Sequence, residues 1–254
     1  MKIAFLGTNG WYSSPTGDTP CILIDSEDRY TIFDAGNGIY KIDQYIKEKK
    51  PISLFVSHFH LDHVSGFHIL NKFSFSQGID IYVAKGRRGD FERLVNPPYT
   101  VGIAKKDENI INLRTEIRLH ELKEGDSDIG FPVHISKLYH AYDDHGYRVE
   151  LEGKSIVYSG DTKRGPNGES LAKEADLLIH ECSNSLSPDP DTWGHTDPIQ
   201  TAQFAKDVGV KKLIMTHFSP THYGTLEKRK EAEEKARSIF PDTIAATDDL
   251  TVEV

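Results

Sequence analysis

Four side chains that can bind metal ions follow directly after one apolar segment of the sequence. They are His58, His60, Asp62 and His63, and the apolar segment spans residues 52–56. Neutral imidazole nitrogens and carboxylate oxygens are ligands that zinc prefers, and four donors at this spacing can supply two ions. A polar loop with chance histidines explains the cluster poorly, because charge-capable groups next to a buried strand are costly without a partner. The cluster therefore predicts a metal site.

Three more candidate ligands end other apolar segments. His140 follows residues 133–139, Asp161 lies in the segment 159–162 right after 156–158, and His217 follows 213–216. Each of them alone could be a capping residue or a solvent-facing residue. A metal cluster on one loop rarely completes its own coordination, however, and strand ends can meet at one edge of a folded sheet. We therefore expect these three side chains to join the first cluster.

The elements that must position these residues follow from the hydrophobic pattern. Strands are expected at 2–6, 19–25, 30–34, 52–56, 79–84, 110–113, 116–121, 131–139, 146–151, 154–159, 176–180, 211–216 and 249–253. Helices are expected at 39–49, 64–74, 90–95, 168–174, 197–208 and 225–238. This order predicts an α/β (α+β) fold in which two mixed β-sheets pack face to face with helices outside, a four-layer αββα sandwich. Residues 1–254 are expected to form a single domain.

Composition limits the kind of partner. The net charge of −9 argues against general coating of nucleic acid, although bound dications would still make a local site positive for a nucleotide-sized substrate. No apolar run approaches the roughly 20 residues that span a membrane. Two cysteines are too few for a disulfide framework, and the N-terminal segment resembles a strand more than a secretory signal. We expect a cytoplasmic setting.

The pattern His58-x-His60-x-Asp62-His63, with the later ligand candidates, resembles the metallo-β-lactamase superfamily. Further segments similar to that family are 5–8 and the Asp-Ala-Gly turn at 34–36. The resemblance implies that one metal ion is bound by His58, His60 and His140. It implies that the second is bound by Asp62, His63 and His217, with Asp161 bridging the two. Two Zn²⁺ ions are expected, with Mn²⁺ or Fe²⁺ as alternatives, and relatives of this kind are often homodimers.

Two later segments are similar to motifs of ribonuclease Z-like phosphodiesterases. These are 178–182, which contains Glu181, and 193–196, which contains His195. The similarity implies that Glu181 orients His195 toward the scissile phosphate. Cys182 departs from the motif, which has alanine there. Only twenty residues separate His140 from Asp161, where ribonuclease Z carries an inserted arm that clamps tRNA. The short connection leaves no room for that arm and puts tRNA 3′-processing in doubt.

The function that follows is a binuclear metal-dependent hydrolase. We expect a phosphodiesterase for small or exposed diesters, such as cyclic phosphates, nucleotides or RNA ends, acting by metal-bridged hydroxide attack. Catalytic roles are expected for Asp62, His195 and Glu181. The first alternative is a carbonyl hydrolase of lactones or thioesters, similar to glyoxalase II, on the same metal site, and the second is a binding module without turnover. Partners would then be small-molecule or nucleotide substrates, with no membrane contact and no extended nucleic-acid surface.

Overall fold

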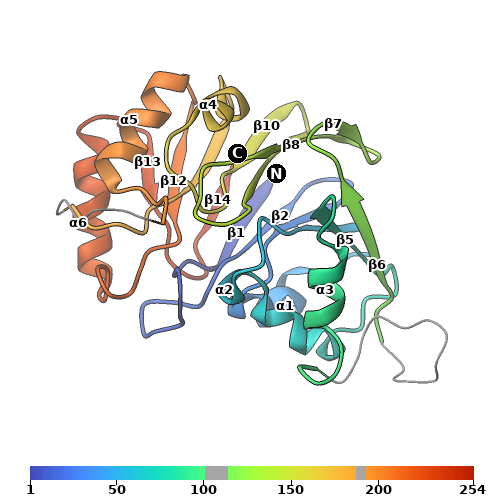
Figure 1. The fold of residues 1–254 in the computed structure, drawn as a ribbon. Coiled ribbons are helices and arrows are strands. Elements are labelled where there is room, and N and C mark those ends of the chain that lie inside the picture. The colour runs from blue at the N-terminus through green and yellow to red at the C-terminus, as the bar shows by residue number, and fades with distance from the viewer. Residues whose placement is uncertain (101–113, 187–192) are drawn as a thin grey trace.

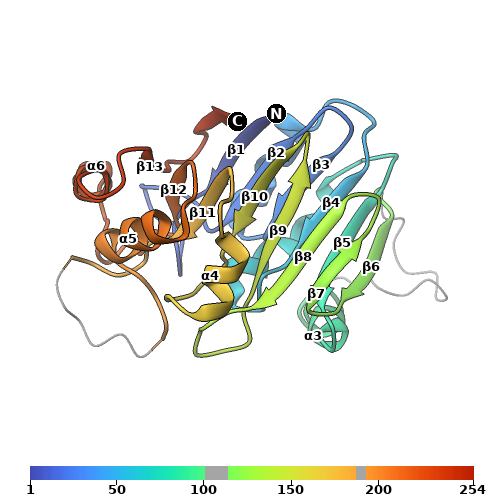
Figure 2. The same ribbon diagram turned by 90° about the horizontal axis from the view of Figure 1, so that it is seen from above.

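Two β-sheets packed face to face form the centre of the molecule. The computed structural model describes residues 1–100, 114–186 and 193–254. Within these ranges each sheet has seven strands, in the orders β14-β1-β2-β3-β4-β5-β6 and β13-β12-β11-β10-β9-β8-β7 (Figure 1, Figure 2). Helices α1, α2 and α3 lie on the opposite side of the strands from α4 and α5 (Figure 1). The αββα sandwich predicted from the sequence is therefore confirmed.

The first sheet is built mainly from the first half of the chain. Its strands are β1 (Lys2–Gly7), β2 (Cys21–Asp25), β3 (Tyr30–Phe33), β4 (Ile52–Phe55), β5 (Ile79–Ala84), β6 (Ile117–Leu122) and the C-terminal β14 (Thr251–Glu253). The strands β3 to β6 run parallel to one another, so their carboxyl ends share one edge. Helical segments between them are η1 (Asn37–Lys41), α1 (Ile42–Tyr45), α2 (Leu61–Val64), η2 (Ser65–Lys72) and α3 (Arg88–Leu94).

The second sheet follows in the second half of the chain. Its strands are β7 (Gly125–Asp128), β8 (Pro132–Lys137), β9 (His145–Leu151), β10 (Lys154–Tyr158), β11 (Leu177–Glu181), β12 (Leu213–Thr216) and β13 (Thr243–Ala245), and its helices are α4 (Pro166–Ala172), α5 (Pro198–Val208) and α6 (Leu226–Arg237). Strand β9 is antiparallel to both β8 and β10, while β10 to β13 are parallel. The carboxyl ends of β8, β10, β11 and β12 therefore face the same way.

Three apolar layers explain the four-layer arrangement. One lies between the two sheets, and the others lie between each sheet and its own helices. In the central layer Phe33 stacks on Tyr158 with ring centroids 5.0 Å apart, and Phe55 contacts Tyr147 at 5.1 Å. Burial of such large rings contributes about 1.5–3 kcal/mol for each side chain. These contacts hold β3 and β4 against β9 and β10 immediately below the ligand loops.

Some expected elements differ from the structure. The segment expected as one helix at 39–49 is a 3₁₀ turn followed by the short α1, because the Tyr30 hydroxyl accepts the backbone N–H groups of Lys47 and Glu48. The helix expected at 64–74 is instead α2 and the 3₁₀ segment η2, where Gly66 packs against the backbone of the 35–36 turn. The strands β7 and β13 were not predicted, and the strand expected at 110–113 lies outside the described residues. Among described helices none is long and apolar enough to cross a membrane.

Candidate metal centre

The loop after β4 places the first cluster. Residues 57–60 form a loop after the carboxyl end of this buried strand, and the helical turn α2 begins at Leu61. His58 and His60 therefore lie on the loop, while Asp62 and His63 lie on α2. The sequence analysis placed all four on the loop, so the structure corrects the position of the last two. Because α2 starts beside the loop, its first turn returns Asp62 and His63 to the same edge.

The second sheet supplies the other three predicted ligands at the same edge. His140 lies in the loop after β8, Asp161 follows β10, and His217 follows β12. The backbone of His217 has a positive φ of 55°, a conformation that histidine tolerates more readily than most residues. The parallel arrangement of β8, β10 and β12 brings the three side chains together, as the strand-end argument predicted.

The seven side chains form two groups, and a third group adds His195. Within each group, ligand-capable atoms lie within 4.8 Å of one another. Among the described residues, the groups are His58, His60, His140 and Asp161; Asp62, His63 and His217; and Asp161, His195 and His217. Asp161 lies within 3.3 Å of the Nε2 atoms of both His63 and His217, so it also contacts the second group.

The spacing of the second group fits a metal ion. The Nε2 atoms of His63 and His217 are 3.1 Å apart, and they lie 3.6 and 3.2 Å from Asp62 Oδ2. A tetrahedral ion with bonds of about 2.0–2.1 Å separates its ligand atoms by about 3.3 Å. Unpaired buried atoms point to the same conclusion for the first group. Among described residues, His58 Nε2, both ring nitrogens of His140 and Asp161 Oδ1 are buried without a hydrogen-bond partner.

Two buried carboxylates orient the histidines from behind. The Asp34 carboxylate, directly after β3, lies 2.7 Å from His63 Nδ1. It also accepts hydrogen bonds from the Ser57 backbone N–H and hydroxyl at 2.8 Å each and from the Tyr158 hydroxyl at 2.6 Å. Asp144 Oδ1 lies 2.9 Å from His58 Nδ1. A histidine whose Nδ1 faces a carboxylate presents Nε2 to a metal in a fixed orientation. The sequence analysis gave neither residue this role, although Asp34 belongs to the quoted 34–36 turn.

Most of the pKa shifts of the site residues favour binding of cations. Burial lowers the pKa of His58, His60 and His140 to about 4, so these imidazoles are neutral, as metal ligands must be. Burial alone would raise the pKa of Asp161, but His217 and His63 hold it well below its usual value. Burial would likewise raise the pKa of Asp62, which His63 and His217 lower instead. The first group therefore combines neutral imidazoles with a carboxylate that stays ionised. Burial alone would lower the pKa of His63, but Asp161 and Asp62 raise it well above its usual value, so His63 must release a proton before it can bind a metal ion.

The predicted Glu181–His195 pair is present beside these groups. Glu181 is the buried last residue of β11, and its Oε1 lies 3.2 Å from His195 Nδ1. The same carboxylate accepts the backbone N–H groups of Ser183 at 2.8 Å and Thr196 at 3.0 Å. The His195 ring lies 5.2 Å from the His140 ring and 5.8 Å from the His217 ring. A rigid carboxylate thus holds an imidazole at the rim of the ligand groups.

The family to which the chain belongs follows from its match to a known family model. Residues 29–218 match the model of the β-lactamase superfamily domain, which is more than half of the chain. The chain belongs to the metallo-β-lactamase superfamily. The resemblance stated from the ligand motif is therefore confirmed.

Ribonuclease Z proteins are among the relatives within this superfamily. The chain is 26% identical to "Ribonuclease Z" of Thermoplasma volcanium over 302 aligned positions, which cover 100% of this chain and 97% of that protein. The structure of the short form of human tRNase Z has a TM-score of 0.77 and 26% identity, with coverage of 100% and 99%. The metallo-β-lactamase fold protein YhfI of Bacillus subtilis has a TM-score of 0.81 at 21% identity, with coverage of 100% and 98%, which supports the fold alone.

The chain is shorter than its ribonuclease Z relative, and its own connection at the metal edge is short. The 302 aligned positions exceed the 254 residues of this chain by 48, so the Thermoplasma protein has residues without a counterpart here. The twenty residues between His140 and Asp161 consist of a short loop and the β9–β10 hairpin. No arm is inserted at this point, as the sequence analysis expected.

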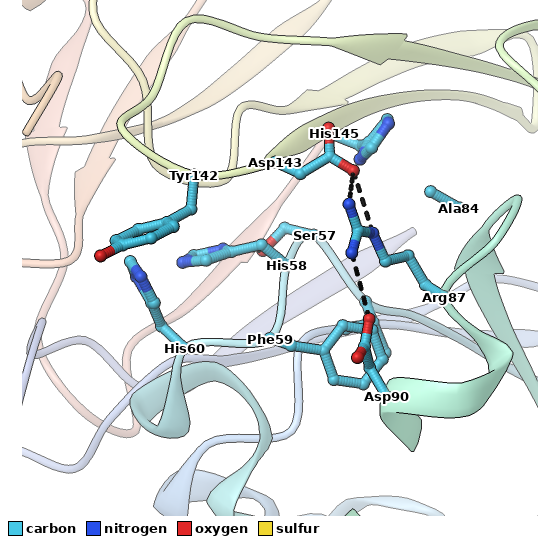
Figure 3. Close-up of a pocket in the computed structure, with 11 residues that line it drawn as sticks. Ser57, His58, Phe59, His60, Ala84, Arg87, Asp90, Tyr142, Asp143 and His145 are labelled. Carbon is cyan, nitrogen blue, oxygen red and sulfur yellow. Dashed lines mark hydrogen bonds and ion pairs between the residues drawn. The ribbon is translucent and has the colours of Figure 1, made fainter. Parts of the chain in front are cut away.

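Two cavities open beside the candidate ligand groups, and His60 borders both. The larger has a volume of about 690 Å³, and it is lined by Trp11, His60, Leu61, Asp62, Asp161, Ser183, Asn184, Trp193, His195, His217, Ser219 and His222. The smaller has a volume of about 270 Å³ and contains His58, His60 and Tyr142 on one side. On its other side Arg87 is bonded to Asp143 and Asp90 (Figure 3). Of these two cavities, only the larger is lined by His195, so the larger cavity is the candidate substrate cleft.

Proposed function

We propose that this metallo-β-lactamase-fold hydrolase is a binuclear-metal phosphodiesterase. The observation that carries the proposal is the Glu181–His195 pair at the rim of two ligand groups, the first containing Asp161 and the second contacting it. Carbonyl hydrolysis needs the metal ligands but gives this pair no role. Relatives of the chain bear the name ribonuclease Z, which denotes enzymes that cleave phosphodiesters.

The ligand groups would hold two divalent ions, which we propose to be zinc, with manganese or iron as alternatives. His58, His60 and His140 would bind the first ion. Asp62, His63 and His217 would bind the second, and Asp161 would bridge the pair. When bound, such ions lower the pKa of water and neutralise the charge on phosphate oxygens. Imidazole and carboxylate donors without thiolates suit all three metals.

The remaining chemistry belongs to His195 and Glu181. Glu181 faces His195 Nδ1 and would stabilise the ring when it carries a second proton. His195 Nε2, on the ring side away from Glu181, would donate its proton to the leaving oxygen of the diester. Proton transfer by a positioned side chain typically contributes 10²–10⁴-fold to the rate. Glu181 is thus a positioning residue, and His195 is the group that would contact substrate.

Small or exposed diesters are the substrates that we propose. The β9–β10 hairpin adds no arm that could grip a large RNA, and the net charge of −9 disfavours an extended nucleic-acid surface. A cavity of about 690 Å³ lies within the usual range for small-molecule sites. Cyclic phosphates, nucleotides and single-stranded RNA ends all meet these limits.

The test is hydrolysis of bis(p-nitrophenyl) phosphate by purified protein. We expect activity that a chelator abolishes and that zinc or manganese restores. A thioester and a lactone are assayed in parallel with the same metal-loaded protein. Turnover of only the carbonyl substrates would refute the phosphodiesterase proposal and favour a carbonyl hydrolase, while turnover of none would favour a binding module.

A further inference from the structure

Trp11 combines an unusual backbone with an unusual exposure. Its φ is 68°, and its side chain is 71% exposed at the wall of the larger cavity. Asp34 and His217 also have positive φ near the metal centre, but aspartate and histidine tolerate this region. A tryptophan there is an outlier, and such outliers persist only where surrounding contacts impose them, typically at ligand sites.

The loop that carries Trp11 is held from several sides. The Trp11 backbone N–H donates to Asp62 Oδ2 at 2.7 Å, so the indole is attached directly beside a proposed metal ligand. Gly10 N–H donates to the Phe218 carbonyl at 3.0 Å, and Phe218 N–H donates to the Thr8 carbonyl at 2.9 Å. The Asn9 amide donates to the carbonyls of Tyr12 and Gly17. These bonds fix the loop on both flanks of Trp11.

Close packing on His217 explains the residue before the tryptophan. A Cβ on Gly10 would lie 2.5 Å from His217 Cε1, so only glycine lets the loop rest on this imidazole. Behind the loop, the buried guanidinium of Arg229 donates to the Thr8 hydroxyl at 2.7 Å. The strain at Trp11 is therefore maintained by bonds and packing that continue into the metal centre. The backbone that carries the indole is thus fixed beside the ligands, while the ring itself stays exposed to the cavity.

We propose that Trp11 is a stacking platform for a nucleobase adjacent to the scissile phosphate. This inference rests on the proposed phosphodiesterase function and specifies its substrate. An exposed indole on a fixed backbone offers a π-face that any base can stack on, and base–aromatic stacking tolerates sequence differences. Tyr12 supports the indole by a T-shaped contact with centroids 5.3 Å apart. Ser183, Asn184 and Ser219 line the same cavity and offer hydrogen-bonding groups for base edges.

The chain provides its own reporter for a binding test. It has two tryptophans, so Trp193→Phe leaves Trp11 as the sole indole, and Trp11→Phe leaves Trp193. Both zinc-loaded variants are titrated with adenosine 5′-monophosphate and with ribose 5-phosphate while indole fluorescence is recorded. We expect saturable quenching of Trp11 by the nucleotide and not by the sugar phosphate. Absence of base-dependent quenching, or quenching confined to Trp193, would overturn the proposal without reference to turnover.

The same titration distinguishes a base at the end of an RNA strand from the base of a single nucleotide. The Trp193→Phe variant is also titrated with an adenylate hexamer. Tighter binding of the hexamer than of the monophosphate would show that the base on Trp11 belongs to the end of an RNA strand. Equal affinities assign it to a single nucleotide. Both results place a base on Trp11.

A kinetic test measures the same contact in the reaction. Thymidine 5′-(p-nitrophenyl phosphate) and the same ester of abasic deoxyribose share the leaving group and differ only in the base. We expect Trp11→Ala to lower the base-dependent advantage in kcat/KM by about 5- to 150-fold, the range for one stacked base. Trp11→Phe should retain most of this advantage. Equal losses on both esters would show that Trp11 serves the shared part of the substrate, which overturns the proposal.

The two tests distinguish failure of the inference from failure of the proposed function. If the unaltered zinc-loaded protein hydrolyses neither ester, the phosphodiesterase proposal fails, and the fluorescence titration still decides whether Trp11 binds a base. If it hydrolyses both esters without preferring the base, the function stands and the platform is refuted.

Discussion

At the scale of single residues, Glu181 determines what His195 can do. The carboxylate is buried, and backbone N–H groups hold it, so it cannot turn away from the imidazole. His195 also belongs to a ligand-capable group with Asp161 and His217. The structure therefore allows two roles for this histidine, a proton donor or a metal ligand. The two roles differ in their effect on metal content.

His195→Ala separates these roles. We expect kcat for a phosphodiester to fall by about 10²–10⁴-fold, because a positioned proton donor is lost. Metal content measured by elemental analysis should stay within twofold of the unaltered protein. His134→Ala, in β8 and bonded to Asp126, is the matched control and should change neither quantity. Parallel loss of metal and activity would make His195 a ligand instead.

Asp144 provides a second residue-scale prediction. Asp144→Asn replaces the carboxyl group beside His58 Nδ1 with an amide, so affinity for the first metal ion should fall by about 10- to 100-fold. Competition with a chromophoric chelator measures the affinity of each bound ion. The neighbouring Asp143→Asn is the control, because Asp143 pairs with Arg87 and Lys137 on the other side of the loop. Equal weakening by both substitutions would contradict an orienting role for Asp144.

The clustering of the candidate ligands was predictable because strand ends of one sheet meet at an edge. His140, Asp161 and His217 all satisfy this rule. The orienting carboxylates were not predictable in the same way. Asp34 and Asp144 act through contacts that join the two sheets or adjoining loops, and a lone aspartate after a strand could equally cap a turn. Only the three-dimensional packing selects between these uses.

At the scale of elements, Asp176 ties the amino ends of three parallel strands. It precedes β11, accepts the Ser155 N–H of β10 at 2.9 Å, and pairs with Lys211 before β12 at 2.7 Å. The hydrogen bond from Lys211 is the main cause that lowers the pKa of Asp176 to about 2, and the Ser155 N–H adds to it. This end of the sheet lies opposite the metal edge, so its effect on stability can be measured separately from catalysis.

A pH series tests the Asp176 link. The folded pKa lies below the unfolded value of about 3.9, so the stabilisation is complete above that value and is lost as pH falls toward 2. Because Lys211 is largely exposed, we expect only about 1 kcal/mol from this pair. Asp176→Asn should therefore unfold more easily in urea at pH 7, with a difference that narrows below pH 4. A constant difference across this range would show that charge does not matter here.

The elements that the sequence analysis missed lack the signals on which it depends. Strand β7, with the sequence Gly-Asp-Ser-Asp, has no apolar alternation and pairs with β8 at the sheet edge. Strand β13 has three residues, too few for a periodic pattern. The hydroxyl group that accepts the N–H groups just after α1 belongs to Tyr30 of β3, so the helical spacing within 39–49 could not reveal where this helix ends. Local pattern identified the longer elements, and tertiary contacts set these boundaries.

At the scale of the whole molecule, the two sheets contribute opposite halves of one centre. His58, His60, Asp62 and His63 come from the first sheet, while His140, Asp161 and His217 come from the second. In the absence of metal, buried imidazoles and carboxylates from both halves lie together with unpaired atoms, which is costly. Bound ions would therefore hold the two sheets together as well as support hydrolysis. Metal binding and stability should be linked.

Removal of metal tests this link. An ion present at 100 times its Kd stabilises the folded state by about 2.7 kcal/mol, and a domain of this size gains about 2–4 °C in Tm for each kcal/mol. We expect chelation to lower Tm by about 5–10 °C for one such ion and by about twice as much for two, measured by differential scanning calorimetry. His140→Ala removes one candidate ligand from the second sheet and should reduce the difference in Tm with and without chelator. His120→Ala, whose histidine is bonded to Asp80 on β5, should leave this difference unchanged. An identical Tm with and without chelator would show that the ligands do not join the sheets through metal.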